Sequence, residues 1–144
     1  MASVLKVNTL TGVTTAGSIA VTGEGNSTTT NLQGGLAKAW VNFNGTGTPA
    51  IQDSLNVSGI TDHTIGDYTL LIDNNMANAS YSYQATSSNW EGTNDDSYIG
   101  VSGTHGGQAT TGQRIKNYRE RYDNATPQFK DPLTANLTVH GDLA

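Results

Sequence analysis

The sequence predicts an all-β protein: an antiparallel, jelly-roll-like β-sandwich knob that follows an extended N-terminal β arm. Only 35% of the 144 residues are hydrophobic and 13% are charged, against about 45–50% and about 25% in average globular chains. Gly, Thr, Asn and Ser replace the missing residues and favour tight turns and half-buried strands. Short alternating segments follow one another with turns at about the 8–12-residue spacing of a sandwich.

The first 35 residues differ from the rest of the chain. They contain two strand-like segments, Val4–Val7 and Gly17–Gly23, and then the polar run Glu24–Asn31. They hold too few apolar residues for a core, and a lone pair of strands is marginally stable in water. We therefore expect residues 1–35 to form an attachment or intertwining arm, with a loose tail as the alternative. Residues 36–144 are expected to form the knob.

The first strand of the knob is expected over Leu36–Phe43 because its side chains alternate in character. Successive residues of a strand point to opposite faces of the sheet. Trp40 and Asn42 therefore share one face, and Val41 and Phe43 share the other.

Further strands are expected along the rest of the knob, each closed by a turn. One or two strands are expected around Ile51–Ile60, because the alternation there allows either. The remaining strands and turns are expected at Tyr68–Ile72, Tyr81–Ala85, Tyr98–Val101 and Leu137–Gly141, with turns at Asn44–Gly47, Asp62–Asp67 and Asp73–Asn75.

The segment Gln113–Tyr122 is compatible with two structures. Tyr118 and Tyr122 are four residues apart and would share a helix face. In a strand, alternate residues would instead share one face: Arg114, Lys116, Tyr118 and Glu120. We favour the strand, because the segments around it are predicted strands and no helix cap precedes it.

The charge is negative overall and unevenly distributed. The net charge is −5, and residues 1–113 contain only two basic residues, Lys6 and Lys38. The other five lie between Arg114 and Lys130. An acidic surface repels phosphate, and one short basic stretch beside Glu120 is a poor nucleic-acid face, so no nucleic-acid partner is expected.

The sequence offers neither thiol chemistry nor a membrane span. It has no cysteine, so disulfides and thiolate metal sites are excluded, and oligomerisation is the expected source of extra stability. No apolar run approaches the roughly 20 residues that a bilayer span needs, so no membrane insertion is expected. Met1–Lys6 is not followed by a signal-peptide core, which argues against secretory export.

No pattern typical of an enzyme is present, and we expect no catalytic residue, no metal and no cofactor. His63, His105 and His140 stand in separate segments without metal-ligand spacing. No serine lies in a nucleophile-elbow context. Calcium binding by clustered oxygen ligands is the alternative for one acidic loop, although its spacing does not fit an EF-hand. That loop contains Glu91, Asn94, Asp95 and Asp96.

The same loop, Ser87–Ser97, is the predicted binding site. Trp90 lies among amides and carboxylates there, where an indole can stack on a sugar ring while its neighbours bind hydroxyls. The alternative is that Trp90 covers the end of the core or packs at a subunit interface. The candidate binding residues are Asn89, Trp90, Glu91, Asn94, Asp95 and Asp96.

Three segments, Ala37–Thr48, Asp53–Asp62 and Gly66–Thr69, resemble a domain found at the ends of tail-fibre and related appendage proteins of tailed bacteriophages, notably marine and cyanobacterial ones. The start, Met1–Thr9, is similar to the starts of such virion proteins. The resemblance covers most of residues 36–144. It implies a trimer of β-sandwich-like knobs at the virion surface, outside the cell after host lysis, and it supplies no catalytic motif.

Together these observations predict a structural virion protein and not an enzyme. The expected role is a short fibre or spike that attaches to a host glycan or envelope protein as a homotrimer. Other virion proteins are expected to bind through residues 1–35. Members of the resembled family often end a much longer fibre, which leaves a capsid decoration or head-fibre protein that stabilises the shell as an alternative. A free carbohydrate-binding module or an extracellular filament subunit is the alternative from another class.

Overall fold

The computed structural model describes residues 4–13, 19–23, 28–88, 97–100, 107–119 and 128–144, with backbone only for residues 97–100 and 119. The chain divides into two compact units, Met1–Leu36 and Ala37–Ala144. The division lies one residue beyond the end of the arm expected from the sequence.

The N-terminal unit contains two short antiparallel strands and one helical turn. Strand β1 (Ala20–Thr22) pairs with β2 (Thr29–Asn31), which confirms part of the strand expected over Gly17–Gly23. Helix α1 (Leu32–Gly35) follows directly, and the Asn31 side chain caps it by accepting the Gly34 N–H at 3.1 Å. The strand expected over Val4–Val7 is wrong, because these residues pair with no other described segment and a strand exists only through such pairing.

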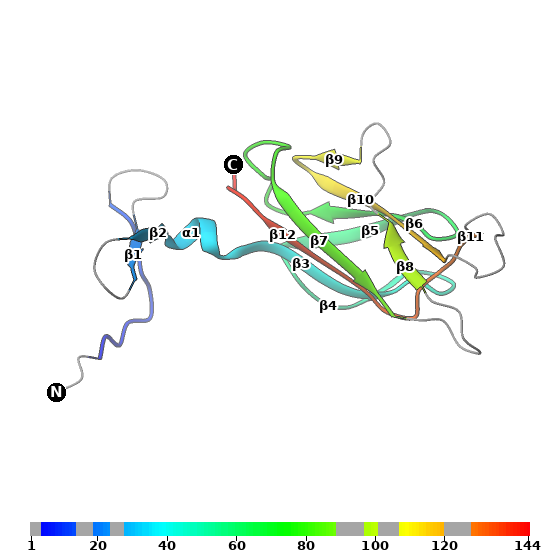
Figure 1. The fold of residues 1–144 in the computed structure, drawn as a ribbon, viewed down its shortest axis with the longest axis horizontal. Helices are drawn as coiled ribbons and strands as arrows, with labels where there is room; N and C mark the ends of the chain where they lie inside the picture. The colour runs from blue at the N-terminus through cyan, green and yellow to red at the C-terminus, as the bar shows by residue number, and fades with distance from the viewer. Residues whose placement is uncertain (1–3, 14–18, 24–27, 89–96, 101–106, 120–127) are drawn as a thin grey trace. The chain divides into compact units, whose positions relative to one another are not determined.

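The C-terminal unit is an antiparallel sandwich of two sheets (Figure 1), which confirms the predicted fold class. The first sheet has the order β4 (Ala50–Leu55), β3 (Ala37–Asn44), β12 (Ala135–His140) and β7 (Ser82–Ser87). The second sheet has the order β5 (Val57–Thr64), β6 (Asp67–Ile72) and β10 (Gly112–Arg119), with β8 (Ser97–Gly100), β9 (Gln108–Ala109) and β11 (Gln128–Phe129) also paired to β10.

Between β4 and β5 the chain passes from the first sheet to the second through one residue, Asn56. Its φ of 54° is left-handed, a conformation that asparagine tolerates better than most residues. Its side chain holds the crossing, since Oδ1 accepts the Asn74 N–H at 2.7 Å and Nδ2 donates to the Lys38 carbonyl at 3.0 Å. The region expected to hold one or two strands therefore holds two.

The turn after β5 is shorter than the sequence predicted. Strand β5 continues to Thr64, so the turn expected over Asp62–Asp67 is confined to Ile65 and Gly66. Polar residues extend β5 because β6 supplies backbone partners, with Thr61 opposite Thr69. Pairing overrides the turn preference of Asp62.

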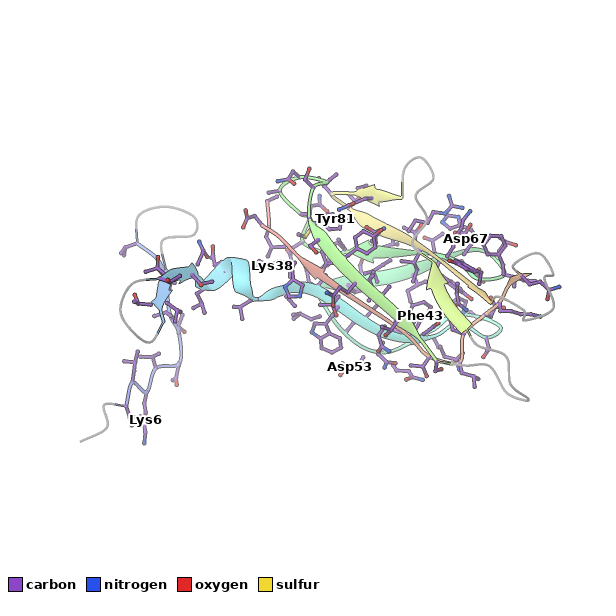
Figure 2. All side chains as sticks on the ribbon, viewed as in Figure 1. Lys6, Lys38, Phe43, Asp53, Asp67 and Tyr81 are labelled. Carbon is purple, nitrogen blue, oxygen red and sulfur yellow. The ribbon has the colours of Figure 1, made fainter. Side chains whose placement is uncertain are left out.

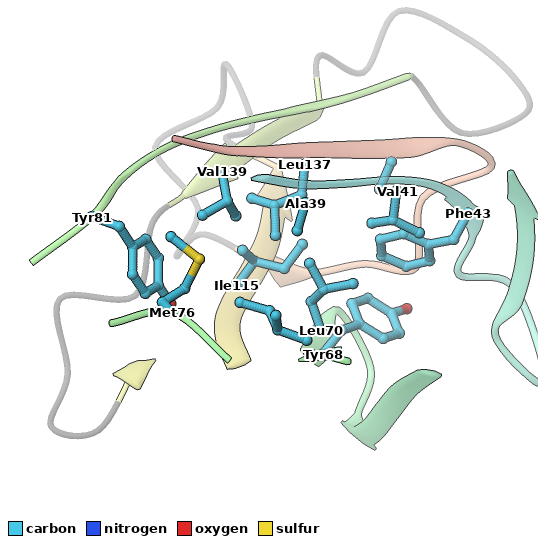
Figure 3. Packing of buried hydrophobic residues seen from close by; sticks show 12 residues of the cluster. Ala39, Val41, Phe43, Tyr68, Leu70, Met76, Tyr81, Ile115, Leu137 and Val139 are labelled. Atoms are coloured by element: carbon cyan, nitrogen blue, oxygen red, sulfur yellow. The ribbon is translucent and has the colours of Figure 1, made fainter. Parts of the chain in front are cut away.

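The core lies between the two sheets (Figure 3). Val41 and Phe43 are each 1% exposed, and Trp40 and Asn42 lie on the opposite face of β3, which confirms the predicted division of these residues between two faces. Phe43 packs edge to face on Tyr68 at one end of the core, with ring centroids 5.2 Å apart. The remaining buried hydrophobic residues are Ala39, Leu70, Ile72, Met76, Tyr81, Ile115, Ala135, Leu137 and Val139.

At each end of the core, a tyrosine hydroxyl forms hydrogen bonds to other segments of the chain. The Tyr68 hydroxyl lies 2.5 Å from Asp131 Oδ1 and 3.0 Å from the Gly45 carbonyl. The Tyr81 hydroxyl lies 2.9 Å from the Gly112 carbonyl. Burial raises the pKa of Tyr68 well above its ordinary value, with a contribution from Asp131, and burial raises the pKa of Tyr81 to about 12. Both hydroxyls therefore stay protonated and can donate these bonds at neutral pH.

A candidate binding face on the second sheet

The predicted binding residues Asn89, Trp90, Glu91, Asn94, Asp95 and Asp96 all lie outside the described residues, so their role stays a prediction. The chain that leads into this loop is described. The Ser87 hydroxyl bonds Asn117 Oδ1 at 2.9 Å, and the Ser88 N–H donates to the Thr134 carbonyl at 2.8 Å. These bonds attach the start of the loop to β10 and to the segment before β12.

Strand β10 (Gly112–Arg119) contains the first part of the basic stretch. This confirms the strand interpretation of that part of the segment. Gln113, Ile115 and Asn117 are buried in the sandwich. The intervening residues therefore point outward. Arg114 and Lys116 are thus brought side by side on the outer face of the second sheet.

Neighbouring strands complete this outer surface. Asp67 of β6 lies opposite Lys116, and Thr69 of β6 lies opposite Arg114. Phe129 of β11 lies opposite Tyr118. We call this surface the basic–aromatic face; its members are His63, Asp67, Thr69, Arg114, Lys116, Tyr118 and Phe129.

A buried carboxylate organises the two cations of the face. Asp67 is 4% exposed and accepts two bonds from Arg114, from Nε at 2.7 Å and from Nη2 at 2.6 Å. Lys116 Nζ lies 3.6 Å from the same carboxylate. The hydrogen bonds from Arg114 lower the pKa of Asp67, and they outweigh the opposing effect of burial. The two cations therefore keep their places over a carboxylate that stays ionised.

An exposed aromatic ring lies beside these charges. The Phe129 side chain is 49% exposed, and Lys116 Nζ lies 5.5 Å from its ring centroid, within cation–π range. At the other side of the face, His63 Nε2 and Thr69 Oγ1 lie 2.8 Å apart. The face thus combines fixed cations, a flat apolar ring and hydroxyl-bonding groups, a combination that suits a polar, negatively charged ligand.

Sequence reasoning assigned this face no binding role. The available signal was the concentration of basic residues between Arg114 and Lys130, with Arg114 and Lys116 at strand spacing. Asp67 lies 47 residues before Arg114, and Phe129 lies 13 residues after Lys116, so strand pairing brings both to the two cations.

Of the three histidines, His63 belongs to the basic–aromatic face, His140 ends β12, and His105 lies outside the described residues. In the described part of the chain, no group of three or more His, Cys, Asp or Glu side chains is placed to hold a metal ion. Among the described residues, no helix is long and apolar enough to cross a membrane.

No protein-family model, no curated protein and no solved structure matches this chain. The structure itself defines the class, an antiparallel β-sandwich protein with a small separate N-terminal unit.

We call Asp67, Arg114 and Lys116 the Asp67 cluster. Its ion pairs predict that the protein loses stability as the pH falls. Because the pKa of Asp67 is lowered from its ordinary 3.8, its contribution is complete above that value and is lost as the pH falls through the lower, folded-state pKa. We expect Asp67→Asn to lower the free energy of unfolding at pH 7 by about 1–2 kcal/mol and to flatten its decline below about pH 4. Urea unfolding followed by tryptophan fluorescence from pH 2 to pH 7 measures both.

The matched control is Asp53→Asn, which alters an exposed carboxylate on β4 that bonds the Ser54 N–H at 2.9 Å. It should change the unfolding free energy by less than about 0.5 kcal/mol. An unchanged acid profile in Asp67→Asn would show that this cluster does not contribute to stability.

Proposed function

We propose that this chain is a structural virion protein of a tailed phage, a short fibre or spike appendage whose β-sandwich knob attaches to the host surface. The observation that carries the proposal is the division into a small N-terminal unit with exposed apolar side chains and a separate, well-packed sandwich. The sequence resemblance of most of residues 36–144 to tail-fibre domains supports it.

The N-terminal unit leaves its apolar side chains in solvent. Leu5 is 79% exposed and Val13 is 94% exposed, and α1 contains no buried residue. Fully burying one Val or Leu side chain stabilises a protein by about 1.5–3 kcal/mol, so packing several of them on another chain would strongly favour association. Among the described residues of this unit, the large apolar side chains that are exposed are those of Val4, Leu5, Val7, Leu10, Val13, Val21 and Leu36.

The sandwich is suited to display. Its core residues are directed inward, and its outer faces carry polar and charged side chains, such as Asn42 on the first sheet and Lys116 on the second, beside a few exposed apolar ones such as Phe129. A trimer would present three copies of each face to one surface. Such multivalency raises weak single-site binding through effective concentration, which is what attachment by shallow surface contacts requires.

We expect the full-length chain to be a trimer that depends on the exposed apolar residues of the N-terminal unit. Leu5→Asp combined with Val13→Asp should convert it to a monomer, because charged residues cannot be buried in an apolar interface without a large penalty. Light scattering coupled to gel filtration gives the native mass. Thr30→Asp, a charge added at an exposed polar position of the same unit, is the control and should remain trimeric.

A monomeric full-length chain would contradict the trimer and would favour a capsid decoration protein. Immunogold labelling of purified particles decides between the two locations. A few labels at the tail support an appendage, whereas labels over the whole capsid support decoration. Particles without label would overturn the virion role.

A further inference from the structure

We propose that the basic–aromatic face binds a carboxylate-bearing sugar, a uronic-acid residue of an acidic surface polysaccharide. This inference rests on the proposed attachment function and names the ligand class and the site. It places recognition on strands β10, β6 and β11 of the second sheet, and not on the loop that the sequence indicated.

Asp67 fixes the Arg114 side chain in a position from which it can also bind a second anion. A guanidinium has five N–H donors, and Asp67 engages two of its nitrogens, Nε and Nη2. The Arg114 side chain is still 35% exposed. Its remaining donors can therefore meet a ligand carboxylate without a loss of side-chain freedom at the moment of binding.

The charge of this cluster is complementary to that of an anionic ligand. One buried carboxylate, Asp67, faces two cations, Arg114 and Lys116, so the cluster carries a net charge of about +1. The whole chain carries −5, and five of its seven basic residues lie between Arg114 and Lys130. An anionic ligand is therefore repelled by most of the protein and attracted to this surface.

An exposed aromatic ring offers a sugar a surface on which to pack. Phe129 is 49% exposed and lies opposite Tyr118, with Lys116 Nζ 5.5 Å from its ring centroid. The C–H face of a pyranose can pack on such a ring, while the sugar hydroxyls reach polar side chains. From Arg114 to Tyr118 the strand extends by about 14 Å, which is longer than one sugar ring. A short segment of polysaccharide therefore fits along β10.

The small extent of the basic surface favours an acidic sugar over a nucleic acid. A nucleic acid carries a phosphate at every nucleotide and needs an extended basic surface. The Asp67 cluster has only a small positive excess. A sugar with one carboxylate and several hydroxyls suits this face and the His63–Thr69 pair beside it.

The test measures binding of the full-length chain to oligogalacturonate by isothermal titration calorimetry, with neutral dextran oligosaccharides and single-stranded DNA as the comparison probes. We expect binding of oligogalacturonate alone, weakened at least 3-fold when the salt is raised from 50 to 300 mM. Lys116→Gln and Phe129→Ala should each weaken it at least 10-fold. Phe129→Tyr should retain it, since the ring remains.

Matched control variants are available for each change. Lys6→Gln removes a cation from the N-terminal unit, and Leu55→Ala removes an apolar side chain, 47% exposed, from β4 of the other sheet. Both should bind like the unchanged protein. Circular dichroism melting of every variant shows that the sandwich is intact.

Several outcomes would overturn the inference: no binding of oligogalacturonate, equal binding of single-stranded DNA, or binding that survives both Lys116→Gln and Phe129→Ala. If the protein still adhered to host cells in those cases, the attachment function would stand with its site elsewhere. If oligogalacturonate binding followed the predicted pattern while particles carried no label, the site would stand and the virion role would fail.

Discussion

In the Gly66→Ala variant, we expect the sandwich to be unfolded in most molecules at physiological temperature. The substitution should lower the free energy of unfolding by about 3–5 kcal/mol. Gly66 has a φ of +69°, a left-handed conformation that disfavours a side chain. A Cβ there would collide with the Asn117 carbonyl oxygen and would lie 2.8 Å from that of Lys130. Both are backbone atoms of paired or hydrogen-bonded segments, so neither can rotate away.

The backbone of Gly66 is also fully used in this turn. Its N–H donates to Asp131 Oδ1 at 2.7 Å, and its carbonyl accepts the Asn117 N–H at 2.7 Å. Any shift that relieves the collision therefore breaks hydrogen bonds that join the β5–β6 turn to β10. The two costs act together, which is why we expect a larger effect than from the left-handed backbone alone.

Gly47→Ala is the matched control, because Gly47 has a similar φ of +66° but no atom within 4 Å of the added Cβ. It should cost only about 1 kcal/mol. Urea unfolding of both variants isolates the collision from the backbone strain. Equal losses in the two variants would show that the packing around Gly66 relaxes freely.

Replacing Phe43 by alanine is the second large effect that we expect, with a loss of about 3–5 kcal/mol. Phe43 is 1% exposed, and its ring packs on Tyr68, which in turn binds Asp131 and the Gly45 carbonyl. The substitution removes an aromatic contact between the two sheets and leaves a cavity at that end of the core. Thermal unfolding followed by circular dichroism should show a fall of roughly 4 °C per kcal/mol.

Phe129→Ala is the control for this substitution. The same side chain is removed, but Phe129 is 49% exposed, so the loss should stay below about 1 kcal/mol. The two variants therefore separate stability from binding, because Phe129→Ala is expected to remove oligogalacturonate binding from a folded protein. A small loss in Phe43→Ala would mean that the core repacks around the vacant space.

The prediction of the fold from the sequence succeeded where hydrophobic alternation was strong. Val41 and Phe43 alternate with half-buried neighbours on β3, and Leu137 and Val139 alternate with polar neighbours on β12. All four side chains are buried. A strand buries every second residue, so this pattern alone determines which face of each strand joins the core. It failed at Val4–Val7, where apolar residues occur without a pairing partner among the described residues.

The candidate site could not be predicted in the same way. The sequence indicated a tryptophan-containing loop, whereas the basic–aromatic face depends on Asp67 meeting Arg114 across 47 residues of chain. Strand order and register arise from backbone pairing between distant segments, and local side-chain patterns do not specify which segments pair. No local sequence pattern around Asp67 predicts that it pairs with Arg114.

The sequence by itself thus determined the all-β class, the inward face of the main strands and the unequal distribution of charge, because each follows from composition or from period-two alternation. The tertiary structure decided the crossing at Asn56, the order of the strands and the meeting of Asp67, Arg114, Lys116 and Phe129. These depend on long-range pairing, whose energy comes from contacts that exist only after the chain has folded.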